Sequence, residues 1–314
     1  MNPRWRRHAA RNRLQSLLLL GFMAAFLVLL GRLLWGPQAV WQLLIAGAIV
    51  VLLTPVASPW LVLRLYRARP LAPDEAPLLF RALDELARRA ELERVPALYY
   101  VPSGMTNAFT VGTRRNAAIA VTDGLLTRLA PREIVAVLAH EVSHIRSNDT
   151  WLMGLADAMS RLTHVLSLFG QVLLLINLPL LVMGQVQLNW LAIALLVFAP
   201  HLSLLAQAGL SHTREYDADF NGALLTGDPE ALAGALAKIE RHQRSLMRLL
   251  LPGFRLPEPS WLRTHPPTEE RIRRLLTLRD ELARESFGEE VAGEGWASRL
   301  APGAPRYRAS GLWY

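Results

Sequence analysis

The sequence contains no cysteine and, among 34 basic residues, a single lysine, Lys238. Without cysteine the chain can form neither a disulfide framework nor a thiolate metal site, and it cannot use a cysteine nucleophile. Charged residues are also sparse, at 19%, whereas hydrophobic residues make up 52%. A chain of 314 residues could hold about two soluble domains, but this balance is unusual for such domains and indicates a membrane protein.

Acidic residues are absent from the first 70 residues, which carry nine arginines. These arginines account for the net charge of +8, because the rest of the chain is close to neutral. A basic excess confined to the flanks of apolar segments is typical of membrane-orientation signals, whereas nucleic-acid recognition favours a basic face on a folded domain. We therefore predict contact with a lipid bilayer and no nucleic-acid partner.

Two long uncharged runs follow the N-terminal arginines, at residues 14–31 and 33–63. Because about 20 apolar residues cross a bilayer, they predict a transmembrane hairpin with helices at about 14–34 and 38–63. A cleaved signal peptide is the alternative for the first run. Its apolar part is too long, however, and no small-residue cleavage site precedes the second run.

A second uncharged block spans residues 162–213 and leaves room for two more crossings, at about 162–183 and 188–208. Its glutamines and asparagines leave a buried or partly embedded helix pair as an alternative. Arginines lie on both outer sides of the first hairpin and are absent from its turn. By the positive-inside rule, the termini and the polar segment after the hairpin are expected in the cytoplasm.

The polar segments have local patterns of their own. Apolar residues recur at helical spacing after Pro73, and short β-rich runs follow at 97–101, 107–111 and 117–122, which predicts a small sheet. Later helices are expected at 211–225, 229–250 and 268–286. The predicted division is an N-terminal tail with the hairpin (1–70), two parts of a catalytic domain (71–150 and 211–287) separated by the second apolar pair (151–210), and a disordered tail (288–314).

The helix that begins at Pro131 carries His140-Glu141-Val142-Ser143-His144. Histidines at i and i+4 lie on one helical face, so both imidazoles can bind one zinc ion, with Glu141 beside the open position of the metal. There Glu141 can act as general base on a water molecule. A chance match is the alternative, but the motif lies in a helix with apolar neighbours.

A catalytic zinc needs a third protein ligand. The extended metzincin pattern is excluded, because Ser147 and Thr150 stand where its glycine and third histidine would be. Glu215 and Asp219, one helical turn apart, are the candidates after the apolar block. Glu215 could be the ligand and Asp219 the acceptor for a zinc-bound imidazole, although acids at a solvated helix start would show the same spacing.

Other residues have weaker signals. The segment from Asn107 to Gly112, with Asn107, Ala108 and Phe109, is expected either as an exposed edge strand that binds an extended substrate or as a plain structural strand. His265 could stabilise the oxyanion of the reaction intermediate or simply precede a helix. Asp149 could accept a hydrogen bond from a ligand imidazole or end a helix in solvent. The remaining histidines, 8, 164, 201, 212 and 242, are expected to be interfacial or surface groups.

Four motifs together resemble those of the HtpX-type integral membrane zinc proteases, gluzincins related to the mitochondrial protease OMA and to the CAAX prenyl proteases. They are the H-E-x-x-H helix, T-R-E-Y-x-A-D after the apolar pair, N-A-F-x-x-G from Asn107, and T-H-P-P-x-x-E-R-I at 264–272. The resemblance covers residues 10–285. It implies one zinc ion per chain, held by His140, His144 and Glu215, with Glu141 as the catalytic base.

The resemblance also implies a fold, a location and a function. The expected fold is a mainly α membrane protein, in which transmembrane hairpins carry a cytoplasmic α+β gluzincin-like domain with a small sheet. The location is the bacterial cytoplasmic (inner) membrane, and the function is stress-related proteolysis of misfolded or damaged membrane proteins. Two alternatives stay open: a processing protease of narrow specificity, and a non-enzymatic membrane scaffold with a structural metal. The oligomeric state is left open.

Overall fold

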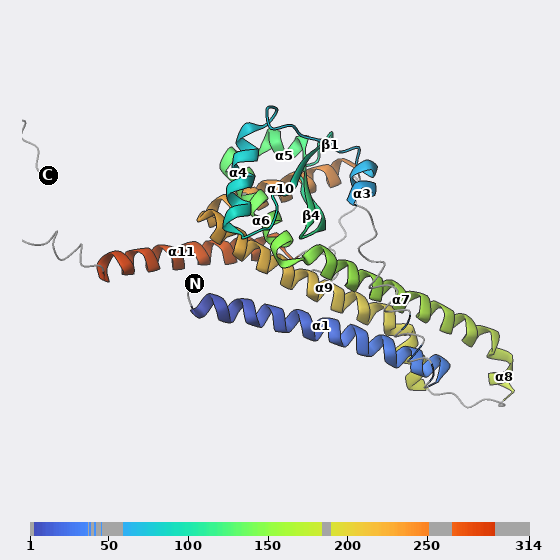
Figure 1. Cartoon of the computed structure of the whole chain (residues 1–314). Helices are drawn as coiled ribbons and strands as arrows, with labels where there is room; N and C mark the ends of the chain where they lie inside the picture. The colour runs from blue at the N-terminus through green and yellow to red at the C-terminus, as the bar shows by residue number, and fades with distance from the viewer. Residues whose placement is uncertain are drawn as a thin grey trace, which may run out of the picture.

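The computed structural model describes residues 3–36, 59–183, 190–250 and 266–292, together with Gln38, Trp41 and Ile45. Three long helices, α1 (Pro3–Trp35), α7 (Asp149–Ile176) and α9 (Trp190–Thr226), lie side by side and extend away from a part that contains the sheet (Figure 1). The molecule is therefore mainly helical with one small sheet, as the sequence predicted.

The three long helices form an apolar bundle. In the described residues, Asn12–Leu33, Asp149–Ile176 and Trp190–Thr226 are long and apolar enough to cross a membrane. Their buried contacts include Met23, Ala156 and Leu210 in one cluster and Leu30 with Ala199 in another. Of the predicted second crossing at 38–63, only its end, within the short helix α3 (Pro59–Leu65), and three isolated residues are described. The rest of that prediction lies outside the described residues.

The second apolar pair differs from the prediction in its bounds. α7 begins at Asp149, before the expected 162, and α9 runs without a break past 208 to Thr226. The expected separate helix at 211–225 is therefore the last part of α9. The helix continues because its polar residues there, including Arg214, Glu215 and Asp219, are buried against other elements rather than solvated. The short α8 (Leu178–Val182) follows α7.

Pro200 lies inside α9 and has no amide hydrogen to donate to the carbonyl of Leu196. Ser167 of α7 donates its hydroxyl to that carbonyl instead, at 2.6 Å, and is fully buried. An unpaired backbone carbonyl in an apolar bundle costs free energy, so this bond allows the proline inside the bundle.

The sheet has four strands in the order β1-β2-β4-β3. They are β1 (Arg69–Pro70), β2 (Ala97–Val101), β3 (Ala108–Thr113) and β4 (Asn116–Thr122). β2 and β4 are parallel, and the other two pairings are antiparallel. The three runs predicted as strands are confirmed to within two residues, whereas the two-residue β1 gave no pattern to detect. β3 lies at an edge, and this edge faces the candidate site described below.

Alternate residues of the central strand β4 pack on opposite faces of the sheet. Ile119 and Val121 face a core with α4 (Pro77–Arg89), α5 (Asp123–Arg128) and α6 (Pro131–Ser147). Ala118 and Ala120 face a smaller cluster that includes Leu63 of α3. The sheet thus supports α6 from one side and leaves β3 at the margin.

Two further helices complete the part that contains the sheet. α10 (Pro229–Leu250) has its predicted bounds and packs against α6, where Lys238 forms an ion pair with Glu133 at 2.7 Å. α11 (Thr268–Ala292) packs on α10 through Leu275 and Leu278. The sequence predicted that this helix would end near 286, but it continues into the segment expected as a tail. Residues 293–314 lie outside the described part.

Candidate metal centre and active site

α6 is built to hold two histidines in fixed positions. Pro131 stands in its first turn, and the carboxylate of Glu133 accepts the backbone N–H of Ala130 at 2.7 Å. The helix ends at Ser147 and is capped by Asn148, whose left-handed conformation (φ 56°) is one that asparagine tolerates. α7 begins at the next residue, so no loop separates the two helices.

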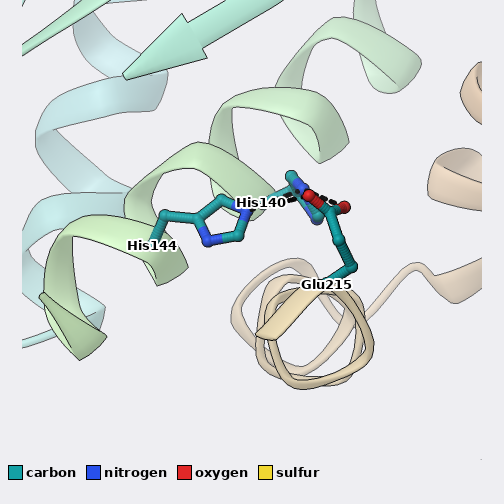
Figure 2. A group of neighbouring side chains, drawn as sticks. All are labelled: His140, His144 and Glu215. Atoms are coloured by element: carbon teal, nitrogen blue, oxygen red, sulfur yellow. Dashed lines mark hydrogen bonds and ion pairs between the residues drawn. The ribbon is translucent and has the colours of Figure 1, made fainter. Parts of the chain in front are cut away.

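His140, His144 and Glu215 converge on one point (Figure 2). The Nε2 atoms of the two histidines are 3.1 Å apart. Oxygens of the Glu215 carboxylate lie 3.6 Å from Nε2 of His140 and 4.0 Å from Nε2 of His144. At least 84% of each side chain is buried, since the exposed fractions are 10%, 16% and 12%. The structure thus brings together the three residues that the sequence put forward as ligands.

A glycine allows α9 to approach α6 closely enough for this convergence. A Cβ atom added at Gly222 would lie 3.0 Å from both the Cα and the backbone nitrogen of His140. Gly222 lies about two turns after Glu215 on α9, so the same close contact sets the distance between the two histidines and the carboxylate.

The outward-facing Nδ1 atoms of both histidines lie near carboxylates. Nδ1 of His144 is 2.8 Å from Oδ2 of Asp149 in a hydrogen bond. Nδ1 of His140 is 3.0 Å from Oδ1 of Asp219, a short contact that is poorly aligned for a hydrogen bond. Such carboxylates orient imidazoles so that the opposite nitrogen faces a metal. The positions expected for Asp219 and Asp149 beside the ligand imidazoles agree with this arrangement.

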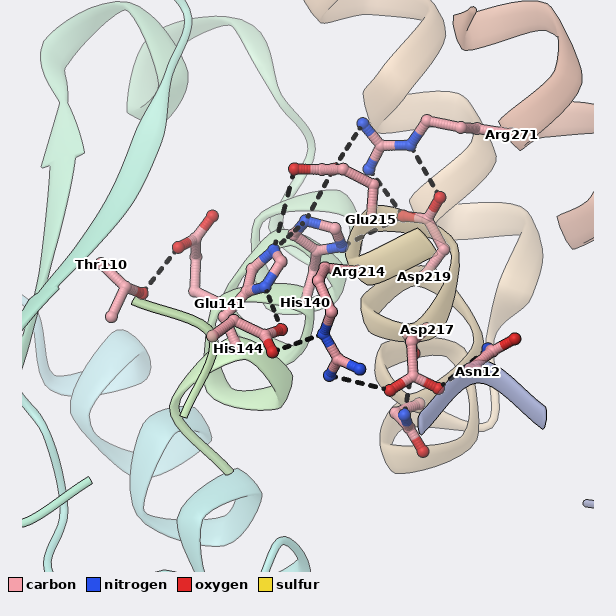
Figure 3. A network of polar contacts seen from close by, with 12 residues as sticks. Asn12, Thr110, His140, Glu141, His144, Arg214, Glu215, Asp217, Asp219 and Arg271 are labelled. Atoms are coloured by element: carbon pink, nitrogen blue, oxygen red, sulfur yellow. Dashed lines mark hydrogen bonds and ion pairs between the residues drawn. The ribbon is translucent and has the colours of Figure 1, made fainter. Parts of the chain in front are cut away.

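Arg271 of α11 is a site residue that the sequence reasoning missed. Its guanidinium donates to both oxygens of Asp219, at 2.7 Å each, and Nη1 lies 3.0 Å from Oε2 of Glu215 (Figure 3). The side chain is 9% exposed, and the charges of Asp219 and Glu215 raise its pKa against the effect of burial. A signal was present, because Arg271 belongs to the E-R-I part of the downstream motif.

The electrostatics of the site favour a cation. Burial lowers the pKa of His144, but the hydrogen bond to Asp149 and the charges of Glu215, Glu141 and Asp149 outweigh it and raise that pKa to about 9. Two imidazole nitrogens and a carboxylate oxygen are also a typical donor set for zinc. The residues present therefore fit a divalent metal ion, with zinc the best match by ligand type.

Glu141 lies next to His140 on α6 but faces the sheet (Figure 3). Its Oε2 accepts a hydrogen bond from the hydroxyl of Thr110, on β3, at 2.6 Å. The sequence analysis included Thr110 in the candidate edge strand but did not predict its contact with Glu141, because only the fold brings these residues, 31 positions apart, together.

An open cleft of about 480 Å³ surrounds these groups. It is lined by Ala108, Phe109 and Thr110 of the edge strand with Asn107 just before them, and by Leu232, Leu236 and Ile239 of α10. Pro266 and Arg271 also line the cleft, whereas His265 lies outside the described residues. Of the other described histidines, none joins the cluster of His140, His144 and Glu215.

Comparisons with known proteins identify the family of the chain. The model of peptidase family M48 matches residues 73–279. A protease HtpX homologue from Acaryochloris marina is 34% identical over 297 residues, which cover 87% of this chain and 97% of the relative. One from Kineococcus radiotolerans is 35% identical over 292 residues, with 86% and 98% covered.

Among solved structures, the crystal structure of Ste24p from S. mikatae matches with a TM-score of 0.43 at 18% identity. The match covers 86% of this chain and 66% of that one. The family model and the curated relatives span most of the chain and include both the H-E-x-x-H helix and Glu215. The chain therefore belongs to peptidase family M48 and, within it, to the HtpX-type membrane metalloproteases.

Proposed function

We propose that this protein is a zinc-dependent endopeptidase of the bacterial cytoplasmic membrane that hydrolyses misfolded or damaged membrane proteins at the cytoplasmic face. The observation that carries the proposal is the convergence of His140, His144 and Glu215 beside Glu141 in an open cleft. A purely structural metal site has no need of a general base or an open side.

His140, His144 and Glu215 would hold one zinc ion per chain. Such an ion supplies Lewis acidity to the scissile carbonyl and to a water molecule. Glu141 removes a proton from the attacking water and later returns it to the leaving amine. Asp149 lies against the imidazole of His144, and Asp219 lies against that of His140. Arg271 contacts the carboxylates of both Glu215 and Asp219, and so fixes the position of Glu215.

Substrate would bind as an extended strand along β3. This strand pairs with β4 on one side only, and its residues Asn107 to Thr110 line the cleft next to Glu141. An exposed edge offers backbone donors and acceptors to any sequence, which suits a protease that cuts unfolded segments. Ile239 of α10, which lines the cleft and is partly exposed, would contact apolar side chains of the substrate.

Features of the whole chain support the proposed location and substrate class. The nine arginines of the first 70 residues favour a cytoplasmic position for both ends of the first hairpin and hence for the cleft. α7 begins at Asp149, which binds His144, and α9 carries Glu215 about three turns before its end, so two of the candidate membrane helices lead directly into the cleft. Membrane proteins with unfolded segments outside the bilayer are the substrates within reach.

The test compares full-length wild type with Glu141→Gln, both purified in detergent, for metal content and casein cleavage. We expect about one zinc in each protein and a loss of roughly 10²–10⁴ in turnover for Glu141→Gln, because a positioned base contributes about this factor. Glu85→Gln, on the exposed face of α4, is the control and should cleave like the wild type.

Three results would contradict the proposal in different ways. Undiminished turnover in Glu141→Gln would remove the mechanism. Metal without casein cleavage in the wild type would favour a narrow processing enzyme or a scaffold. A wild type that binds no metal would contradict the assignment of His140, His144 and Glu215 as ligands.

A further inference from the structure

A continuous series of polar contacts runs from the candidate metal ligand His144 to the first membrane helix (Figure 3). Asp149 uses Oδ2 to bind Nδ1 of His144 and Oδ1 to accept Nε of Arg214, at 2.8 and 2.6 Å. Arg214 donates through Nη2 to Oδ2 of Asp217 at 3.0 Å. Asn12 of α1 donates to the other oxygen of Asp217 at 3.2 Å.

Every member of this series beyond His144 is buried. Asp149 is 3% exposed, Arg214 5%, and Asp217 and Asn12 7% each. Buried charges are costly unless they are paired and hydrogen-bonded, and here each carboxylate has one partner on each oxygen. Removal of one member therefore leaves its neighbour with an unpaired polar atom, and the effect passes to the next contact.

Arg214 is the central member because it joins elements that are far apart in the chain. It lies on α9 next to Glu215, whereas Asp149 lies at the start of α7, directly after the H-E-x-x-H helix. The planar guanidinium can meet both carboxylates only in a narrow range of positions. Arg214 thereby fixes the position of Asp149, the Nδ1 partner of His144, relative to α9.

Asn12 extends the series to α1. It lies at the start of the candidate membrane span Asn12–Leu33 and, among the α1 residues whose side chains the structure describes, is the one that contacts the series. An asparagine facing a helix interface is favourable only where its amide finds a partner, and Asp217 provides that partner. The contact exists only while α1 is docked on α9.

We propose that Arg214 is a positioning residue for the metal ligand His144, and that Asn12 makes the metal affinity of the site depend on the docking of α1. This inference rests on the metal site of the proposed function. It adds that the membrane bundle acts on the site through named side chains, and it requires no contact of Arg214 or Asn12 with the substrate.

The experiment measures the zinc dissociation constant of full-length variants in detergent, by competition with a chromogenic chelator. Arg214→Met should raise the constant about 10- to 100-fold, the range typical for loss of a group that orients a metal ligand. Arg214→Lys should recover part of this loss, because lysine restores the positive charge but cannot contact both carboxylates as the planar guanidinium does. Asn12→Leu, of similar size, should raise the constant by a smaller factor, about three- to tenfold.

Ser16→Ala is the matched control. Ser16 is a buried polar residue of α1 whose hydroxyl bonds the carbonyl of Asn12 in its own helix, so its loss should leave the zinc affinity unchanged. Thermal unfolding of the metal-free variants separates affinity from folding, and Asn12→Leu carries the test if Arg214→Met does not fold. In an Asp217→Leu background, Asn12→Leu should have no further effect, because the contact is already lost.

Equal zinc affinity in Asn12→Leu and Ser16→Ala would overturn the dependence on α1. An affinity loss explained entirely by a smaller folded fraction would overturn the positioning role of Arg214. A wild type that binds zinc but does not cleave casein would contradict the proposed function alone, since the affinities still test this inference. A wild type without zinc binding would overturn both.

Discussion

At the scale of single residues, Thr110 connects the candidate base to the edge strand. Its hydroxyl donates to Glu141 at 2.6 Å, so it holds the carboxylate in one rotamer. We expect Thr110→Val to lower kcat about tenfold with little change in KM, since a hydrogen bond to a charged group is worth about 1.5–3 kcal/mol. Steady-state kinetics on a peptide substrate would measure this.

Thr110→Ser is the control, because it keeps the hydroxyl and should retain most of kcat. If Thr110→Val and Thr110→Ser have the same kcat as the wild type, the hydrogen bond does not position the base. A change confined to KM would indicate instead that Thr110 acts through the substrate strand.

Local spacing explains which site residues could be predicted. His140, Glu141 and His144 lie within five residues of one helix, so their mutual geometry follows from helical periodicity alone. Glu215 and Asp219 could be proposed because they are one turn apart. The roles of Thr110, Arg214 and Arg271 did not follow from spacing, since they arise from contacts between distant elements, although Arg214 and Arg271 both lie in motifs that carry the family resemblance.

At the scale of elements, the crossing of α6 and α9 depends on Gly222. An alanine there would place its Cβ 3.0 Å from the backbone of His140, and backbone atoms cannot yield without moving a helix. We expect Gly222→Ala to destabilise the fold by about 1–3 kcal/mol and to weaken metal binding, because α9 carries Glu215 away from the histidines. Thermal unfolding and the zinc dissociation constant would show both effects.

Gly209, earlier on α9, offers a matched control. A Cβ at Gly209 would meet only the side chain of Leu19 at an ordinary 3.6 Å. Gly209→Ala should therefore be neutral or stabilise the helix by up to about 1 kcal/mol. Equal behaviour of the two variants would mean that the close approach at Gly222 is not what sets the distance.

The backbone hydrogen bond that Pro200 removes from α9 gives a second test at this scale. Ser167→Ala removes the donor to the Leu196 carbonyl that Pro200 leaves open, and should cost about 0.6–1.7 kcal/mol. In a Pro200→Ala background the helix can satisfy this carbonyl itself, so the cost of Ser167→Ala should shrink. A double-mutant cycle by unfolding in detergent measures the coupling, and additive effects would contradict it.

Elements with clear boundaries were predictable. Turn residues flank β2, β3 and β4, and Pro229 marks the start of α10, so these bounds agree closely with the structure. The sequence analysis did not predict that α9 continues to Thr226, because a polar segment after an apolar helix is typical of a solvated helix start. Only the packing of α6 and α11 around it shows that those residues are buried.

At the scale of the whole molecule, a metal ion held by His140, His144 and Glu215 would link α6 to α9. Because the unfolded chain lacks this site, binding should stabilise the fold, by about 2.7 kcal/mol when the free metal is 100 times the dissociation constant. We expect chelation to lower the unfolding temperature and to reduce amide protection at the Glu215 end of α9. Readdition of zinc should restore both.

Glu215→Gln serves as the comparison, since it should respond to chelator far less than the wild type. Unchanged unfolding of the wild type after chelation would argue against a metal link between the two helices.

The presence of a membrane bundle was predictable from the long uncharged runs. The way in which α1, α7 and α9 place the site was not predictable, because hydropathy carries no information on which helix faces meet.

Because α6 and α7 meet at Asn148 without a loop, the length of α7 sets the distance between the cleft and the uncharged part of that helix. α7 rises from this joint through Asp149 to Arg161, its last charged residue before the uncharged block, with no loop to shorten the path. At 1.5 Å per residue this stretch is about 18 Å long. An extended polypeptide covers that length with about five or six residues. A peptide bond closer than this to the bilayer would stay beyond the reach of Glu141 until its segment had been drawn outward.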